Sequence, residues 1–367
     1  MTNSNQVKLK PGDTIGILGG GQLGRMLAMA AARLGLRCQV FSPDPDSPAF
    51  DVVLNATCAE YADVEALESF ASDVDVITYE FENVPAAAAM VLDARRPVLP
   101  NRSILETTQD RLAEKDFVKR LGIGTAVYAD VTSVATLRSA IATIGLPAVL
   151  KTRRFGYDGK GQVILREGDD VAKIWADLGT KAAILEAFVP FEREISVIAA
   201  RSATGQVECF DVTENEHRDH ILKVSRVPAS IPEELAEEAR SIATRIANAL
   251  DYVGVLAVEM FVLANGEGPK VLVNEIAPRV HNSGHWTLDG ASISQFEQHI
   301  RAIAGWPLGK PVRHGDVTMT NLIGEEINGY EEWLKAPGAT VHIYGKGVAR
   351  PGRKMGHVTQ VAPSRTK

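Results

Sequence analysis

The feature that most constrains this chain is a strand–glycine–helix pattern near its N-terminus. The apolar run Thr14–Leu18 is followed by glycines at positions 19, 21 and 24, and then by the helix-forming segment Leu27–Ala32. This G-x-G-x-x-G spacing is typical of a tight turn whose backbone comes close to a ligand. Asp44, twenty positions beyond Gly24, would complete a dinucleotide-binding pattern. The pattern therefore raises the hypothesis of a nicotinamide-dependent oxidoreductase.

Residues 14 to about 100 alternate between apolar, strand-like runs and helix-like runs. Such alternation predicts a parallel sheet with helices on both faces, that is, a Rossmann-like domain, with a ligand outside the carboxyl ends of the strands. The expected strands are Thr14–Leu18, Arg37–Phe41, Val74–Thr78 and Val98–Leu99, and the expected helices are Gly21–Leu34, Asp63–Ala71 and Pro85–Ala94.

Beyond a strong helix at Asp110–Leu121 the pattern changes to closely spaced strands, which indicates a separate domain of α+β character. A long helix, Glu233–Leu250, interrupts them, and turn signals in the last 60 or so residues predict a small β-rich C-terminal domain. The expected strands are Ala148–Lys151, Gln162–Leu165, Ala183–Ala187, Ile195–Ala200, Val207–Phe210, Val255–Val262 and Lys270–Ile276.

Composition excludes several classes of protein. A chain of 367 residues predicts two or three domains, and a formal net charge of −7 without a basic stripe argues against nucleic acid as a constitutive partner. No run of about 18 apolar residues predicts a membrane span, and no signal peptide is recognisable. Cys38, Cys58 and Cys209 lack CxxC spacing and cannot all pair, so we expect reduced thiols and a cytoplasmic protein.

A second glycine-rich segment follows Lys151, which ends an apolar strand. Three glycines in Gly156–Gly161 stand beside Arg153, Arg154 and Lys160. Backbone N–H groups in such a loop can surround phosphates while lysine supplies a charge. It is not a Walker A loop, because GxxxxGK[ST] is absent. The alternative is a glycine-rich hairpin with solvated charges.

Glu259 and Glu275 each lie inside a strongly apolar strand. A buried carboxylate is costly unless it is paired or bound to a metal. On antiparallel neighbouring strands the two could face each other and hold magnesium together with substrate phosphates. Salt bridges to a nearby cation, or solvent-facing positions on an edge, are the alternatives.

Two polar clusters and two single carboxylates complete the candidates. Arg279, His281, Asn282, Ser283 and His285 follow the Glu275 strand, where a loop could build a site or merely cap a turn. The segment KGVARPGRK holds Lys346, Arg350, Arg353 and Lys354, which indicates a phosphate clamp or a solvated basic turn. Glu186 and Glu194 flank two strands and could equally be surface charges.

Together these segments resemble the ATP-grasp superfamily of carboxylate–amine ligases, and more narrowly the family of 5-(carboxyamino)imidazole ribonucleotide synthases of purine biosynthesis. The resemblance runs from about residue 14 to about residue 357, and its last motif is the most specific. The motifs that carry it are GILGGGQLGRM, TYEFENVP, QDRLAEK, GYDGKGQ and NEIAPRVHNSGHWT.

The resemblance implies a pre-ATP-grasp domain at 1–105, an ATP-grasp domain at 106–300 with a lid subdomain at about 125–190, and a C-terminal domain at 301–367. It also implies magnesium, or manganese in its place, on Glu259 and Glu275, with Glu186–Val189 as the hinge that meets adenine and Glu194 on the ribose. The implied ATP contacts are Arg111, Lys151, Gly156, Tyr157, Asp158, Gly159, Lys160, Gly161, Gln162, Glu186, Ala187, Phe188, Val189, Glu194, His217, Asn274 and Glu275.

The implied reaction is the ATP-dependent carboxylation of 5-aminoimidazole ribonucleotide by bicarbonate, through carboxyphosphate. On this basis we expect Arg279 and His281 to orient bicarbonate and carboxyphosphate, and Asp158 and Lys160 to position or deprotonate the attacking amine. The expected ribonucleotide contacts are Gln22, Leu23, Glu80, Lys346, Arg353 and Lys354, the last three for its phosphate. The family also suggests a homodimer.

Three rival functions remain. A nicotinamide oxidoreductase leaves residues 151–285 unexplained. A second ATP-grasp ligase could use a formyl, aminoacyl or biotin acceptor. A catalytically silent regulatory relative is the third, and the presence of Lys151, Glu259 and Glu275 weighs against it.

Overall fold

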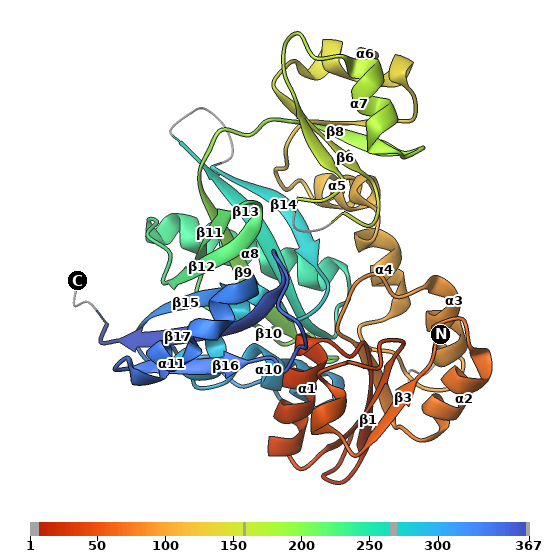
Figure 1. The fold of residues 1–367 in the computed structure, drawn as a ribbon, viewed down its shortest axis with the longest axis vertical. Helices are drawn as coiled ribbons and strands as arrows, with labels where there is room; N and C mark the ends of the chain where they lie inside the picture. The colour runs from red at the N-terminus through yellow and green to blue at the C-terminus, as the bar shows by residue number, and fades with distance from the viewer. Residues whose placement is uncertain (1–6, 157–158, 265–269, 365–367) are drawn as a thin grey trace.

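The computed structural model describes residues 7–156, 159–264 and 270–364. Its N-terminal part is a four-stranded parallel sheet in the order β3-β2-β1-β4, at the lower right of Figure 1. The predicted parallel sheet is therefore confirmed. Its strands are β1 (Thr14–Leu18), β2 (Arg37–Ser42), β3 (Asn55–Cys58) and β4 (Val76–Tyr79), and its helices are α1 (Gln22–Arg33), α2 (Val64–Ser72), α3 (Ala86–Asp93) and α4 (Arg102–Thr108).

Two details of this sheet differ from the prediction. The edge strand β3 was not predicted, because its residues are largely exposed and show no apolar alternation. The expected strand Val98–Leu99 is only an isolated parallel bridge between Val98 and Ile77. The prediction of a full strand there is wrong, because the two residues pair with β4 at a single position.

A small antiparallel sheet in the order β5-β8-β6-β7 projects at the top of Figure 1. Two helices pack against it over a core of its own, to which Leu137, Leu150 and Leu185 contribute. Its elements are β5 (Tyr128–Val131), α6 (Val134–Ile144), β6 (Ala148–Thr152), β7 (Gln162–Leu165), α7 (Val171–Leu178) and β8 (Ala183–Ala187).

The centre is a nine-stranded sheet in the order β14-β13-β9-β11-β12-β15-β17-β16, with β10 paired to β9. The C-terminal strands join this sheet through the pairing of β12 with β15. The strands are β9 (Phe191–Arg201), β10 (Val207–Cys209), β11 (Thr213–Arg218), β12 (Ile221–Val227), β13 (Gly254–Leu263), β14 (Val271–Ala277), β15 (Asp316–Ile323), β16 (Ala339–Ile343) and β17 (Lys354–Ala362).

Both faces of this sheet are covered, which explains the continuous apolar runs of β9 and β13. On one face Val197 and Ala199 share a core with α8, and on the other Ile198 and Ala200 share a core with α1 and α10. The remaining helices are α5 (Arg111–Arg120), α8 (Glu233–Ala249), α9 (Thr287–Gly290), α10 (Gln295–Ile303) and α11 (Tyr330–Lys335), with 3₁₀ turns at Phe50–Val52, Asn282–Gly284 and Gly324–Gly329.

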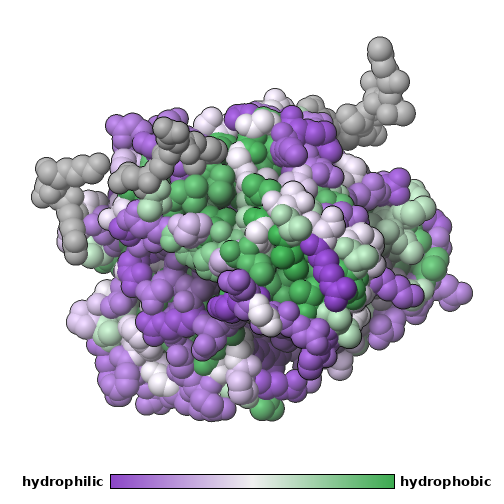
Figure 2. All heavy atoms as spheres, turned by 90° about the horizontal axis from the view of Figure 1, so that it is seen from above, coloured by the Kyte–Doolittle hydropathy of each residue, from purple (hydrophilic) through white to green (hydrophobic). Residues whose placement is uncertain are grey.

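The surface seen from above mixes both kinds of side chain, with hydrophobic ones near the middle of the view and hydrophilic ones around them (Figure 2). Within the described ranges, no helix combines the length and the apolar character needed to cross a membrane.

Candidate active site

Lys151 on β6 and Glu186 on β8 are the residues that the small sheet contributes to the candidate site. The Lys151 Nζ donates to Glu186 Oε2 at 2.9 Å, and the Nζ of Lys115 from α5 lies 3.6 Å from the same oxygen. Burial opposes ionisation of Glu186, but Lys115 and Lys151 outweigh it and hold the pKa of this carboxyl at about 2. The Glu186 side chain therefore faces the lysines through Oε2, and its buried Oε1 has no hydrogen-bond partner among the described residues.

The rest of the predicted hinge continues from β8. The N–H of Ala187 donates to Val127 O at 2.8 Å and that of Phe188 to Pro147 O at 3.3 Å, while the Phe188 side chain is exposed. Val189 accepts the N–H of Phe191 at 2.9 Å. These bonds fix the path of the chain between the small sheet and the central sheet.

Arg111 connects the second glycine loop to the central sheet. Its Nη1 donates to Glu275 Oε2 and its Nη2 donates to the carbonyl of Gly156, both at 3.2 Å. Gly159 and Gly161 have φ values of 77° and 72°, a conformation that favours glycine. Gln162 pairs with Lys151 across the β6–β7 ladder. Tyr157 and Asp158, the other two residues predicted in this loop, lie outside the described residues.

Two arginines of this loop are engaged elsewhere. Arg153 donates to both carboxylate oxygens of Asp110, which caps α5, and Arg154 donates to Gln109 at 2.9 Å. The positive charge directed at the site therefore comes from Arg111, Lys115 and Lys151 rather than from these two arginines.

Glu259 and Glu275 are opposite each other in the antiparallel β13–β14 ladder, which confirms the predicted pairing. Burial and the charge of Glu275 raise the pKa of Glu259 to about 7. Magnesium takes a few carboxylate oxygens together with phosphate and water oxygens. Two facing carboxylates that resist joint ionisation therefore fit a divalent cation, although the described residues contain no group of three or more acidic, His or Cys side chains placed to hold one.

Glu194 and His217 form a hydrogen-bonded pair on β9 and β11, beside the carboxylate pair. Burial would lower the pKa of His217, but the bond and charge of Glu194 raise it above its usual value. Asn274, next to Glu275, has a buried Oδ1 without a hydrogen-bond partner among the described residues. The predicted nucleotide contacts from β9, β11 and β14 thus border one region of the central sheet.

Arg279 and His281 lie at the end of β14. The Arg279 guanidinium binds both carboxylate oxygens of Glu82. Burial works against ionisation of Glu82, yet Arg279 holds its pKa at about 2. The Nε2 of His281 lies 3.5 Å from Glu259 Oε1, and burial and Arg279 lower its pKa to about 3. His281 is therefore a neutral ring between the carboxylates and a fixed cation.

The first glycine loop already holds a carboxyl group, that of Glu80. The N–H groups of Gly21 and Gly24 donate to Glu80 Oε1 and Oε2 at 2.6 and 2.7 Å. Glu80 therefore occupies the place at the start of α1 where a dinucleotide pyrophosphate would lie. Asp44 accepts the N–H of Asp46 at 3.0 Å in a turn. The nicotinamide hypothesis is thus inconsistent with the loop that suggested it.

The predicted ribonucleotide contacts lie within this loop and in the basic segment near it. Gln22 and Leu23 open α1, and the charge of Lys346 acts on Glu80. The Lys346 Nζ donates to the carbonyl of Lys354 at 2.8 Å, while the charge of Lys354 acts on Glu259 and His281. The Arg353 guanidinium donates to Val348 O at 3.1 Å. The basic segment thus runs from the first glycine loop to the carboxylate pair.

Three residues of this region were not predicted: Glu82, Glu114 and Lys115. Lys115 follows Arg111 by four residues, so helical periodicity would have placed the two cations on one face. Glu82 meets Arg279 across 197 positions of sequence, and no local pattern signals such a contact. Lys160, by contrast, was predicted and is described, at the end of the loop.

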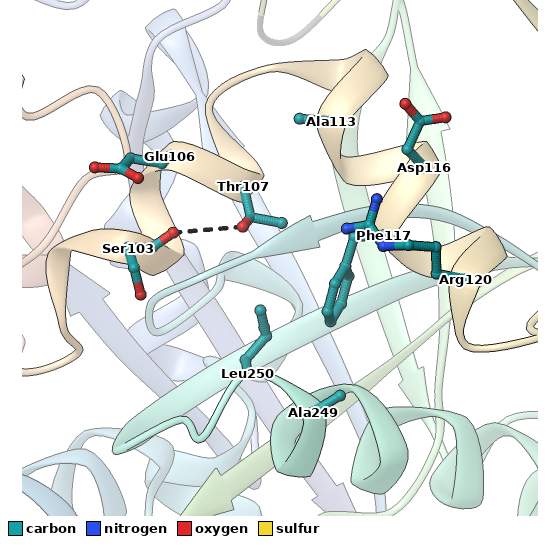
Figure 3. A pocket seen from close by; sticks show the side chains of 9 residues that line it. All are labelled: Ser103, Glu106, Thr107, Ala113, Asp116, Phe117, Arg120, Ala249 and Leu250. Atoms are coloured by element: carbon teal, nitrogen blue, oxygen red, sulfur yellow. Dashed lines mark hydrogen bonds between the residues drawn. The ribbon is translucent and has the colours of Figure 1, made fainter. Parts of the chain in front are cut away.

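A groove on the other face of α5 has a volume of about 500 Å³ (Figure 3). It holds none of the predicted site residues, and Figure 3 shows Phe117 from α5 above Leu250 at the end of α8. Its lining residues are Ser103, Glu106, Thr107, Ala113, Asp116, Phe117, Arg120, Ala249 and Leu250.

Three family models match consecutive parts of the chain. Residues 13–109 match the ribonucleotide synthetase preATP-grasp domain, and residues 116–296 match the ATP-grasp domain. Residues 317–367 match the phosphoribosylaminoimidazole carboxylase C-terminal domain. The first match covers the four-stranded parallel sheet, the second covers the small sheet and strands β9–β14 of the nine-stranded sheet, and the third covers strands β15–β17 of that same sheet.

Known proteins are similar to this chain in sequence and in structure over almost its whole length. N5-carboxyaminoimidazole ribonucleotide synthase of Brucella melitensis is 52% identical over 361 residues, which cover 98% of this chain and 99% of that protein. The crystal structure of the Staphylococcus aureus synthetase with ADP has a TM-score of 0.93 at 36% identity, covering 98% and 96% of the two chains. The Aspergillus clavatus synthase with ADP and 5-aminoimidazole ribonucleotide has a TM-score of 0.89 at 30% identity, covering 96% and 95%.

Proposed function

This chain belongs to the family of N5-carboxyaminoimidazole ribonucleotide synthases, ATP-grasp ligases of purine biosynthesis, and from that premise we propose its reaction and the roles of its residues. ATP, bicarbonate and 5-aminoimidazole ribonucleotide react to give N5-carboxyaminoimidazole ribonucleotide, ADP and phosphate. The observation that carries the assignment is the facing pair Glu259–Glu275 beside Arg111, Lys151 and the second glycine loop, in a chain 52% identical to a named synthase.

The reaction needs two steps, because bicarbonate is a poor electrophile. An oxygen of bicarbonate attacks the γ-phosphorus of ATP, the bond to ADP breaks, and carboxyphosphate forms. The amine of the ribonucleotide then takes the carboxyl group, directly or as released CO₂, while phosphate leaves and the nitrogen gives up a proton. Catalysis of the first step is mainly positioning and charge stabilisation.

Each part of the site has a role in this scheme. Lys151 and Arg111 neutralise the phosphates, and the loop Gly156–Gln162 covers them and excludes water from the short-lived carboxyphosphate. Glu194 and His217 bind the ribose, and the backbone of Ala187–Val189 meets the adenine. Lys115 and Lys151 both contact Glu186 Oε2. Because Lys115 neutralises part of the charge of this carboxylate, Lys151 remains able to bind phosphate.

Glu259 and Glu275 would hold the divalent cation, with Asn274 beside them. When bound, magnesium would offset negative charge on the transferred phosphoryl group. The raised pKa of Glu259 supports this role. Two facing carboxylates repel each other when both are ionised, and a bound cation would offset that repulsion.

Arg279 and His281 would orient bicarbonate. Glu82 holds the guanidinium in place, and the neutral imidazole of His281, whose Nδ1 accepts the N–H of Ser283, can donate one hydrogen bond from Nε2. Asp158 and Lys160 would position or deprotonate the amine. Gln22, Leu23 and Glu80 would meet the ribonucleotide, and Lys346, Arg353 and Lys354 its phosphate.

We also propose that the chain divides into domains at about residues 105 and 300, with the small sheet as the lid, and that it acts as a cytoplasmic homodimer. Light scattering of the purified protein tests the dimer, since a mass of one chain across the working concentration range would exclude it.

The decisive assay is ADP formation with each substrate omitted in turn. The proposal predicts turnover that requires both bicarbonate and 5-aminoimidazole ribonucleotide. If a different acceptor stimulated ADP formation and the ribonucleotide did not, the chain would be an ATP-grasp ligase with another substrate. If the rate of ADP formation depended on neither bicarbonate nor the ribonucleotide, the proposed reaction would be contradicted.

A further inference from the structure

Strand β14, which carries Glu275, is an edge strand of the nine-stranded sheet. Among the described residues its only ladder partner is β13, so its outer backbone groups need partners from elsewhere. Gly124 and Thr125 bond Val273, and helix α5 supplies the partners on either side of Glu275. Glu114 Oε2 accepts the N–H of Ile276 at 3.0 Å, and Lys115 Nζ donates to the carbonyl of Asn274 at 2.8 Å. The two contacts lie on either side of Glu275.

The ladder itself does not fix this part of β14. Glu259 pairs with Glu275, but the next residue of β13, Met260, pairs with Val273. Asn274 therefore has no opposite residue, which is the arrangement of a β-bulge. A bulge bends its strand and redirects the side chains beside it. Arg111 binds one oxygen of the Glu275 carboxylate, but the direction in which this side chain leaves the strand depends on what else holds residues 274 and 276.

Burial of Glu114 and Lys115, the two α5 residues that bond β14, costs desolvation free energy. Glu114 is 4% exposed and Lys115 is 2% exposed, on a helix whose apolar side already packs on the core through Val118. Apolar side chains would have attached α5 to the sheet at lower cost, since burial of charged groups is unfavourable unless they are well paired. The polar pair satisfies backbone groups only at residues 273, 274 and 276.

We propose that Glu114 and Lys115 are positioning residues, which hold the bulged segment of β14 so that the Glu275 carboxylate faces Glu259. They do not touch the substrates in this role; they act through the backbone on either side of Glu275. This inference rests on the proposed use of Glu259 and Glu275 as metal ligands.

The test measures Mn²⁺ binding to the full-length protein with ADP, by electron paramagnetic resonance titration. Glu114→Leu removes the acceptor for the Ile276 N–H, whereas Glu114→Gln keeps one. Residues that orient metal ligands typically change affinity 10- to 100-fold, so we expect weaker Mn²⁺ binding by about tenfold or more in Glu114→Leu and near-normal binding in Glu114→Gln.

Thr125→Val is the matched control. Thr125 Oγ1 donates to Val273 O at 2.9 Å on the same strand, but it does not contact either neighbour of Glu275. It should destabilise the protein while leaving Mn²⁺ affinity within about twofold of the wild type. If Glu114→Leu does not fold, Lys115→Met tests the other contact by the same titration, with the same loss expected.

Glu275→Gln separates the two proposals. Loss of Mn²⁺ binding in Glu275→Gln with unchanged binding in folded Glu114→Leu and Lys115→Met would overturn the positioning role alone. Unchanged binding in Glu275→Gln would overturn the metal site. A loss in Thr125→Val as large as in Glu114→Leu would show a general effect of strand stability, and would also overturn the positioning role.

Discussion

The glycine loop at residues 19–24 joins β1 to α1, and the loop at residues 153–161 joins β6 to β7. Both follow an apolar strand and both are rich in glycine. They differ in what surrounds them. The first binds the carboxylate of Glu80 through two N–H groups, whereas the second lies beside Arg111 and Lys151.

The difference shows that a glycine pattern predicts a close approach to the backbone but not the chemical nature of the approaching group. Glycine spacing indicates that something approaches the backbone closely, because a Cβ would collide; at Gly21 it would lie 2.6 Å from Glu80 Oε1. The chemical nature of that neighbour is set by the charges that tertiary structure brings to the loop. A loop whose N–H groups already bind a carboxyl group is occupied, and a loop that lies beside cations can bind a phosphate.

The largest expected effect comes from removing a cation at the second loop. Lys151→Met should reduce ADP formation by about 100- to 1000-fold, the usual range for loss of one electrostatic contact to a reacting group. The ammonium that neutralises the phosphates would be gone, and Glu186 would retain Lys115. Steady-state kinetics with all three substrates measures the effect.

Lys181→Met is the control for that variant, because Lys181 is an exposed lysine on the same small sheet unit. Its kinetics should match the wild type. Equal rates for Lys151→Met and the wild type would mean that the second loop is not the phosphate site.

A smaller effect is expected at the first loop. Gly21→Ala places a Cβ against the buried Glu80 carboxylate, so we expect the free energy of unfolding to fall by about 1–3 kcal/mol, as is usual for overpacking. ADP affinity should be unchanged, since that loop does not hold ATP. Urea denaturation and ADP titration measure the two quantities.

Gly329→Ala is the comparison, because Gly329 has φ −87° and open space around its Cβ position. It should change the free energy of unfolding by less than about 0.5 kcal/mol. Loss of ADP binding in Gly21→Ala would contradict the separation of the two loops.

The smallest effect is expected where the parallel sheet meets the central sheet, at His299 between Thr78 of β4 and Val255 of β13. Buried His299 accepts the N–H of Val255 on Nδ1, so its neutral ring carries the proton on Nε2 and donates to Thr78 of the first sheet at 2.8 Å. Burial lowers its pKa to about 3, from the usual 6.5. Between these values the unfolded chain binds more protons than the folded one, so stability falls as pH falls.

For one histidine the slope approaches about 1.4 kcal/mol per pH unit below about pH 6.5. His299→Gln should reduce the slope of unfolding free energy against pH by up to that amount. Buried His285 and His357 have lowered pKa values too and remain in both proteins, so the difference isolates His299. Parallel pH profiles for the two proteins would contradict a neutral His299.

Sequence patterns predicted much of this fold because burial is periodic. The strands of the first sheet other than β3, the helices α1, α2, α3, α5 and α8, and the strands β6–β10, β13 and β14 were all anticipated within a few residues. Strand β11, with the sequence TENEHR, was not, because one of its faces borders the site and carries polar side chains.

The candidate site was predictable where chemistry is local. The facing of Glu259 and Glu275 followed from two apolar strands each holding a carboxylate, and the structure confirms it. Contacts between distant segments were not predictable: Glu80 reaches Gly24 across 56 positions, and Glu82 reaches Arg279 across 197. The metal role and the ligand contacts stay predictions.

The most direct test is a crystal structure of the protein with ADP, Mg²⁺ and 5-aminoimidazole ribonucleotide. We expect the ADP phosphates to lie against Lys151 and the second loop, the cation to lie between Glu259 and Glu275, and Glu80 to remain bound to Gly21 and Gly24. ADP phosphates on the N–H groups of Gly21 and Gly24, with Glu80 displaced, would contradict this expectation.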